Sequence, residues 1–357
     1  MLEFINNRIA DFNISYFVNE LAIASKNLGI LEAKIDSYQF NSILIPMLQR
    51  KEAVSSMYIE GTQTTITDVL KSEVNPQSTD ERIRQEVQNH IHTLIYGAEY
   101  LRTGKFTHTF IKKIHEYMMT GIITPGLEKT LGKYKTKDNQ IKSSVGTVVY
   151  TPPSAAETKK YMDELLSFMN NDTDGLNTLI KAAMIHSQFE SIHPFSDGNG
   201  RIGRVLISLY LYKAKVINFP FFYISETINM DKPVYYRMLT DSRTNSLDEW
   251  IKYFLHKVSL QTVKHIGYID SLNALYTKTK NTVKGCINSP KFDEIIECLF
   301  THPMLNANFL EDQLSVSHGQ AIRYLNTLER SKVLISDDRK RGKTFFFSEL
   351  IDLAQRA

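Results

Sequence analysis

The residues best suited to chemistry lie between His193 and Arg204, in the sequence HPFSDGNGRIGR. Gly198 and Gly200 flank Asn199 where an amphipathic helix is predicted to begin. Glycines allow several backbone N–H groups to turn toward one point, and the positive end of the helix dipole faces the same point. The sequence therefore predicts an anion-binding site at the start of this helix.

Four side chains around this turn indicate which anion it binds. Arg201 and Arg204 are spaced to project from one side of the first helical turn, which suits a polyphosphate better than a single carboxylate. Asp197 can hold a hard cation such as Mg²⁺ against phosphates. His193 can accept a proton from an incoming nucleophile near neutral pH. This combination predicts transfer of a phosphate-centred group.

The same loop resembles the Fic family signature HPFxxGNGRxxR at every fixed position. The resemblance implies a protein adenylyltransferase that uses ATP and Mg²⁺. His193 would deprotonate a Ser, Thr or Tyr hydroxyl of a target protein, and that oxygen would attack the α-phosphate of ATP. Phe195 would anchor the loop in the core. The implied ATP-binding residues are Asp197 with the metal, Gly198, Asn199 through backbone and side chain, Gly200, Arg201 at the β-phosphate, Arg204 at the γ-phosphate, and Tyr235 or Tyr236 near the adenine.

Residues 134–153 have a composition unlike the rest of the chain. The β-branched run from Val145 to Val149, followed by Tyr150 and two prolines, predicts a β-hairpin or extended flap. The resemblance implies that Val148, Val149 and Tyr150 pair with the backbone of the target by strand addition.

The segment from Ser56 to Gly61, SMYIEG, resembles the inhibitory motif [S/T]xxxE[G/N] of the family. Gly61 suits the end of a helix, which would leave Glu60 free to pair with Arg204 where the γ-phosphate would bind. We therefore expect auto-inhibition within the chain. In some relatives the same glutamate supports AMP removal, which leaves reversal of the modification open for this chain.

Simpler interpretations exist for each residue. His193 alone would be read as a core histidine, Asp197 as a helix N-cap, and Glu60 as a solvated charge at a helix end. Arg201 and Arg204 would be surface charges. Nothing in the loop discriminates adenine from uracil, so transfer of UMP is an alternative.

The elements that position these residues are predicted to be mainly α. We expect a Fic-type helical bundle with a short β-hairpin flap and a C-terminal winged helix-turn-helix. Helical spacing of apolar residues covers 17–48, 83–101, 106–119, 155–170, 176–189 and 247–263. The expected domains are an N-terminal helical region at 1–105 carrying the inhibitory motif, a catalytic core at 106–272, a polar linker at 273–290 and a winged helix at 291–357.

The composition of the 357 residues bears on nucleic-acid binding, membrane contact and cellular location. The net charge of +3 is too small to indicate nucleic-acid binding by the whole chain. Basic residues in 291–357 leave a DNA-binding regulator as an alternative, although winged helices also dock proteins. The sequence predicts a cytoplasmic protein with free thiols and no membrane contact. Self-modification and a homodimer are two further alternatives that the sequence leaves open.

Overall fold

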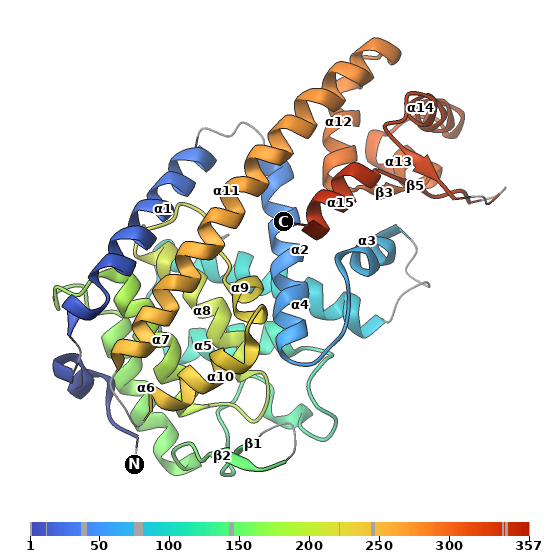
Figure 1. Cartoon of the computed structure of the whole chain (residues 1–357). Coiled ribbons are helices and arrows are strands. Elements are labelled where there is room, and N and C mark those ends of the chain that lie inside the picture. Colours follow the sequence, from blue (N-terminus) through green and yellow to red (C-terminus); the bar gives the residue numbers. More distant parts are fainter. Residues whose placement is uncertain are drawn as a thin grey trace. The chain divides into compact units, whose positions relative to one another are not determined.

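The computed structural model describes residues 2–11, 13–36, 41–74, 81–142, 146–220, 222–243, 247–337, 339 and 342–356. Within these residues the chain is mainly helical (Figure 1). It divides into two compact units. The first unit comprises Met1–Ala33, Ser55–Gln63 and Gln85–Val263, and the second comprises Lys34–Val54, Thr64–Arg84 and Lys264–Ala357. The expected N-terminal region at 1–105 therefore contributes to both units.

Two central helices form the core of the first unit. Every residue of α7 (Thr178–Ile192) from Leu179 to Ile192 is buried, and so is most of the facing helix α8 (Asn199–Lys213). Helices α5 (His108–Met119), α6 (Ala155–Met169), α9 (Ser225–Asn229) and α10 (Lys232–Asp241) belong to the same unit. The loop between α7 and α8 contains the sequence singled out above.

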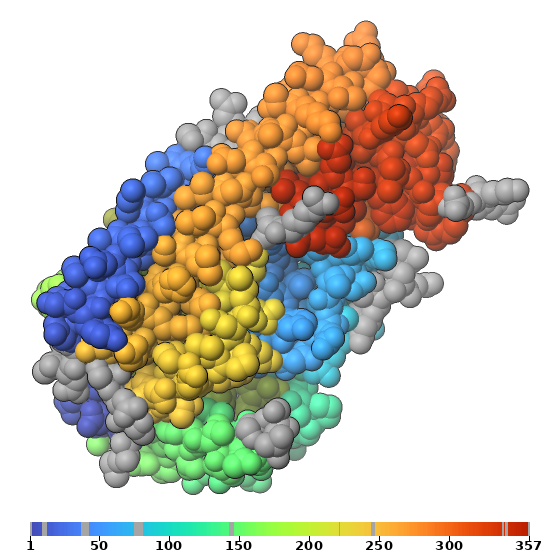
Figure 2. Space-filling model, viewed as in Figure 1, coloured from blue at the N-terminus to red at the C-terminus, as the bar shows by residue number. Residues whose placement is uncertain are grey.

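The predicted hairpin is confirmed. Strands β1 (Ile141–Lys142) and β2 (Val148–Tyr150) pair antiparallel, with Ile141 opposite Tyr150. Val148 and Val149 are 43% and 46% exposed, and this part of the chain reaches the surface of its unit in green (Figure 2). Helix α6 follows directly. Ser154 caps it in a capping box with Glu157.

The second unit contains three helices followed by a small sheet. Helices α12 (Phe292–Thr301), α13 (Ala307–Leu314) and α14 (His318–Arg330) match the predicted order. Strands β4 (Ile335–Ser336) and β5 (Phe345–Phe346) pair antiparallel, and β3 (Met304–Leu305) adds to the other edge of β5. The sequence did not predict β3 or the terminal helix α15 (Ser348–Arg356), which packs on α3 (Ile66–Val74).

Long helices contribute residues to both units. They are α1 (Val18–Asp36), α2 (Asn41–Ile59), α4 (Glu81–Leu101) and α11 (Leu247–Cys286). The linker expected at 273–290 is wrong as far as Cys286, because this segment is the end of α11. Leu275, Tyr276 and Val283 are buried at helical spacing, and the Lys and Thr residues between them gave the segment its linker-like composition. Among the described residues, no helix is both long and apolar enough to cross a membrane.

Candidate active site

Helix α7 ends at His193, whose backbone takes the left-handed conformation with φ 48°. The amide of Asn139 donates hydrogen bonds to the carbonyls of His193 (3.2 Å) and Phe195 (3.1 Å). The N–H of Lys135 donates to the carbonyl of Pro194 at 2.8 Å. The segment before β1 therefore fixes the backbone of the loop, and with it the position from which the imidazole projects.

The Phe195 ring anchors the loop in the core, as expected. It is fully buried and stacks on the His115 ring with centroids 3.8 Å apart. The Asn199 side chain accepts from the N–H of Phe195 and donates to its carbonyl, both at 2.8 Å. The Asn199 amide therefore closes the loop, with one of its two N–H groups bonded to the Phe195 carbonyl.

Helix α8 begins with Gly198 in the left-handed conformation, φ 77°. A Cβ at this position would lie 2.5 Å from the sulfur of Met119, so only glycine fits without displacement. The first N–H groups of a helix have no acceptor within it. The backbone of Asn199, Gly200 and Arg201 thus presents donors at the positive end of α8, which is the predicted anion site.

Arg204 and the segment 56–61 meet at this helix. The Glu60 carboxylate lies 2.7 Å from Nη2 of Arg204, and the two side chains are 28% and 1% exposed. The Ser56 hydroxyl oxygen accepts from Nε and Nη2 of the same guanidinium at 3.1 and 2.9 Å. Gly61 ends the segment with φ 96°, as predicted for a helix terminus. The structure therefore brings Ser56, Glu60 and Arg204 together.

The Glu60 carboxylate also covers the start of α8. A Cβ on Gly200 would lie 2.5 Å from Oε1 of Glu60, which shows how closely this oxygen approaches the glycine backbone. Burial raises the pKa of Glu60, but the positive charges of Arg204 and Arg201 outweigh it and hold that pKa below its usual value. An ionised carboxylate thus lies against the backbone donors that suit a phosphate.

Arg201 is held differently from Arg204. Its guanidinium forms an ion pair with Glu86 of α4 at 2.7 Å and contacts the sulfur of Met119. Arg201 does not line the cavity described below, although its charge reaches Glu60. The two arginines therefore share one helix end, but only Arg204 faces the cavity directly.

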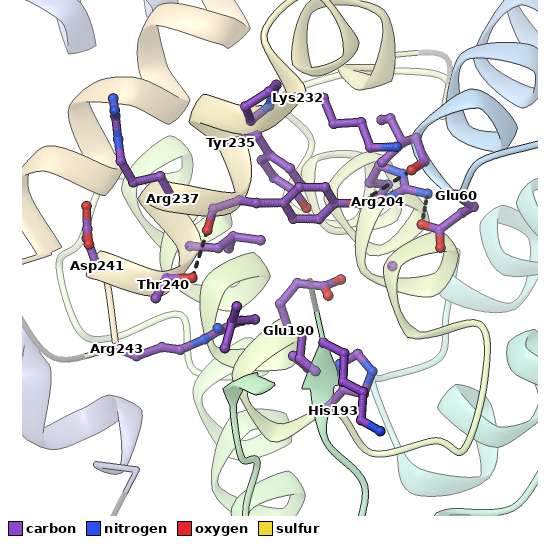
Figure 3. A pocket seen from close by; sticks show the side chains of 18 residues that line it. Glu60, Glu190, His193, Arg204, Lys232, Tyr235, Arg237, Thr240, Asp241 and Arg243 are labelled. Carbon is purple, nitrogen blue, oxygen red and sulfur yellow. Dashed lines mark hydrogen bonds and ion pairs between the residues drawn. The ribbon is translucent and has the colours of Figure 1, made fainter. Parts of the chain in front are cut away.

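A cavity of about 790 Å³ opens beside the loop. Figure 3 shows His193 and Glu190 on one side of it and Arg204 with Glu60 on another. Of the predicted site residues, its lining includes Glu60, Val149, His193, Gly200, Arg204, Tyr235 and Tyr236. Asp197, Gly198, Asn199, Arg201, Ser56, Gly61, Val148 and Tyr150 lie outside the lining.

Burial controls the protonation of two side chains in this cavity. It lowers the pKa of His193 to about 4, and the positive charge of Lys135 acts in the same direction. His193 is therefore a neutral imidazole at physiological pH, which is the form that accepts a proton. Burial raises the pKa of Glu190 to about 7. Sequence reasoning missed Glu190, since a glutamate inside a helix gives no local sign that it faces a cavity.

The two tyrosines expected near the adenine have different surroundings. Tyr235 is 1% exposed, and its hydroxyl lies 2.9 Å from Nε2 of His186. The other nitrogen of His186 is 3.1 Å from the carbonyl of Gly203, so His186 donates to that carbonyl and accepts from Tyr235. Tyr236 is 44% exposed, and its hydroxyl donates to the carbonyl of Ile59 at 3.4 Å. Both rings form part of the cavity wall.

The Asp197 carboxylate fits a single bond to Mg²⁺. One oxygen accepts from the N–H and the hydroxyl of Thr124, and the other accepts from the N–H of Gly198. Burial raises the pKa of Asp197, but these hydrogen bonds hold it below its usual value. The second oxygen keeps a lone pair, and Mg²⁺ is commonly bound by one or two carboxylates together with phosphates. No cluster of three acidic, His or Cys residues occurs in the described part of the chain.

Comparisons with known proteins give matches along much of the chain. The model of the Fic/DOC family matches residues 105–211, and that of the Fic/DOC family N-terminal region matches 18–99. A probable protein adenylyltransferase from Aquifex aeolicus is 23% identical over 180 residues, covering 49% of this chain and 51% of the relative. A protein adenylyltransferase from Caenorhabditis briggsae is 23% identical over 137 residues, covering 38% of this chain and 25% of the relative.

The matched parts thus span about half the length, or less, of these two relatives. The crystal structure of a Fic family protein from Desulfovibrio desulfuricans G20 superposes with a TM-score of 0.61 at 20% identity, covering 94% of this chain and 97% of that chain. This likeness confirms the expected fold class over most of the chain. The winged helix stays a prediction.

Proposed function

Because the chain belongs to the Fic/DOC family, whose two models together span more than half of its 357 residues, we propose that it is a protein adenylyltransferase. It moves AMP from ATP to a hydroxyl group of a protein. The observation that carries this proposal is that His193, the Gly200 backbone and Arg204 line one cavity at the start of α8. The general base and the phosphate-binding site therefore lie in the same cavity.

His193 acts as the general base in this proposal. Its imidazole is neutral because burial lowers its pKa, and the hydrogen bonds from Asn139 and Lys135 to the loop fix its position. It takes the proton from the acceptor hydroxyl, whose oxygen forms a bond to the α-phosphorus of ATP while the bond to pyrophosphate breaks. Pyrophosphate leaves, and the proton stays on the imidazole.

The start of α8 binds the nucleotide's phosphates. The N–H groups around Gly200 donate to phosphate oxygens, and Arg204 supplies a buried positive charge beside them. Asp197 would hold Mg²⁺, which when bound adds positive charge to the phosphates. Arg201 contributes its positive charge near the same helix end. Tyr235 and Tyr236 form the part of the cavity wall that would contact the adenine. UMP transfer remains the alternative, since these contacts address phosphates.

We further propose that Glu60 inhibits the enzyme. Its carboxylate occupies Arg204 at 2.7 Å and lies against Gly200, where phosphate would bind. The Glu60 carboxylate and a phosphate cannot both occupy the position beside Arg204 and Gly200. Productive binding of ATP therefore requires the Glu60 side chain to move away. The same carboxylate can also serve the removal of AMP from a modified target, the reverse reaction that the sequence leaves open.

The acceptor protein approaches along the hairpin. Val148 and Val149 are exposed on β2, which in the described part of the chain pairs along one edge, with β1. The other edge of β2 suits pairing with an extended segment of the target. The target's identity is open, and self-modification is included, since a Ser, Thr or Tyr only has to reach this strand.

Intact-mass spectrometry tests the proposal. Glu60→Gly protein is incubated with Mg²⁺ and, separately, ATP, UTP, GTP or CTP, with and without an added protein acceptor. A mass gain of one nucleotide monophosphate names the donor, and His193→Ala in the same background should abolish it. Lack of any gain with every nucleotide would falsify the assignment.

The second unit supports a separate proposal, that residues 291–357 form a winged helix-turn-helix. Three helices and the antiparallel order β3-β5-β4 agree with it. Two of the basic residues that favoured DNA binding are paired within the unit: Lys343 lies 3.0 Å from Glu329, and Arg339 lies 2.7 Å from Asp337. These pairs reduce the positive charge available to phosphates, so adenylyl transfer is the function that the structure favours.

A further inference from the structure

Arg243 is a cavity residue that the proposed mechanism does not use. It follows α10 and contacts two other elements. Its guanidinium carbon lies 4.0 Å from the centroid of the Tyr150 ring on β2. Its Nε donates to the hydroxyl oxygen of Ser191 on α7 at 3.2 Å, and that hydroxyl donates to the carbonyl of Ser187 at 2.6 Å.

These contacts connect the hairpin with the helix that ends at the catalytic base. Ser191 lies two positions before His193 in the chain. Tyr150 is opposite Ile141 in the register of the hairpin, and both Ile141 and Val149 line the cavity. A guanidinium lying over an aromatic ring is attracted to the ring's face, more strongly when water is excluded. The Arg243 side chain is therefore a direct link between β2 and α7.

Further contacts hold the same end of the hairpin. Asn139, just before β1, donates to the catalytic loop, while Asp138 accepts from the N–H of Ala155 at the start of α6. On β2, Tyr150 pairs with Ile141 of β1, and its ring stacks on Arg243. The stack therefore adds a side-chain contact that connects β2 with α7.

We propose that Arg243 is a positioning residue for the protein acceptor: by stacking on Tyr150 and bonding to Ser191, it sets the β2 strand at a fixed distance from His193. This inference rests on the proposed function. It also changes the role of Tyr150, whose ring supports the strand from within while the backbone of β2 and the exposed valines remain available to the target. Arg243 touches neither the proton nor the phosphate in this account.

The test uses variants of the full chain in the Glu60→Gly background. Arg243→Ala and Tyr150→Leu remove the two sides of the stack, whereas Tyr150→Phe keeps the ring and serves as the matched control. Amide hydrogen exchange of residues 146–151 is measured without ligand. We expect the exchange rate to rise about 5- to 20-fold in the first two variants and to stay unchanged in the control. A cation–π contact of this kind changes an opening equilibrium by roughly that factor.

Transfer kinetics then separate positioning from nucleotide binding. With dephosphorylated casein as the acceptor probe, the KM for casein should rise several-fold in Arg243→Ala and Tyr150→Leu, while the KM for ATP stays within about twofold. The double variant should be no worse than either single one, because both remove the same contact.

Two results would overturn the proposal. An equal rise in the KM for ATP would make Arg243 a nucleotide ligand, and unchanged exchange at 146–151 would show that the stack does not hold the strand. Failure of the Glu60→Gly parent to transfer any nucleotide, to itself or to casein, is a different result. It would count against the proposed function, and the exchange measurement would still decide whether Arg243 holds β2.

Discussion

Glu60 and Arg204 meet at 2.7 Å although 144 positions separate them in the chain. Arg204 is almost completely buried, and Ser56 accepts three further hydrogen bonds from it, two on its hydroxyl oxygen and one on its carbonyl. Removing one partner of a buried charge pair leaves the other charge buried without compensation, which is energetically unfavourable. In this cavity an incoming phosphate is the group that can replace the carboxylate.

Replacing Glu60 with Gln should therefore raise the rate of AMP transfer. The amide keeps the shape of the side chain and removes its charge. A hydrogen bond to a charged group contributes about 1.5–3 kcal/mol, so the expected gain is roughly tenfold or more. The measurement is labelled-AMP incorporation at fixed ATP. Glu116→Gln, which removes the charge of a half-exposed pair with Lys113 on α5, is the control and should match wild type. Equal incorporation by both variants would end the idea of inhibition by Glu60.

The protonation of His193 can be measured directly. Burial lowers its pKa to about 4, so the ring should stay neutral as the pH falls from 8 to 5. The NMR signals of the ring, assigned by their loss in His193→Gln, should hold the neutral position throughout this range. A transition centred near 6.5, the value for a solvated histidine, would contradict burial as the dominant effect.

Stability should fall in acid because of His90. Burial, followed by the positive charges of Arg204 and Arg201, lowers the pKa of His90 to about 3, whereas the unfolded chain has a value near 6.5. Between these two values the unfolded state binds a proton that the folded state does not, so the free energy of unfolding decreases as the pH falls below about 6.5. At pH 5 this loss amounts to roughly 2 kcal/mol.

His90→Met should reduce the drop in Tm between pH 7.5 and pH 5 by a corresponding amount. His92→Met provides the control, because His92 is exposed on the same helix. Parallel Tm profiles for wild type and His90→Met would show that this histidine does not contribute to the acid sensitivity.

Gly198 is predicted to be irreplaceable for activity. An alanine there would meet the Met119 sulfur at 2.5 Å in a backbone with φ 77°. Gly175 has a similar φ of 69° but open space around it. Both substitutions cost about 1–2 kcal/mol for the left-handed backbone, and both should lower Tm. Only Gly198→Ala should also lose AMP transfer, measured in the Glu60→Gln background. Comparable activity of the two variants would mean that the loop accepts a displaced Met119.

The sequence was most informative where a function depends on adjacent residues. The loop from His193 to Arg204, the hairpin and the inhibitory segment all lie where their local patterns predict them. Backbone conformation at Gly198 and Gly61, and the burial of Phe195, follow from residue type and neighbours within a few positions. The contact between Glu60 and Arg204 required the family resemblance, because no local pattern joins two segments so far apart.

Other features depend on packing and could not be predicted from the sequence. The end of α11 resembles a linker in composition, yet a few buried apolar residues keep it helical. From the sequence, the Asn199 amide suits either phosphate or backbone groups of the loop. Only the folded loop shows that it bonds to the backbone of Phe195. Glu86, Glu190 and Arg243 are ordinary charged residues in sequence. Their roles arise from the elements that surround them.

A carboxylate carried on the same chain as the site it blocks behaves as a tethered competitor. Its local concentration is set by the fold of the chain, and dilution of the protein does not change it. Under the inhibition proposed above, Glu60 would be displaced either by a nucleotide or by any event that draws the end of α2 away from Gly200. The resting state of the protein would then depend on the ratio of free nucleotide to an internal competitor of constant concentration.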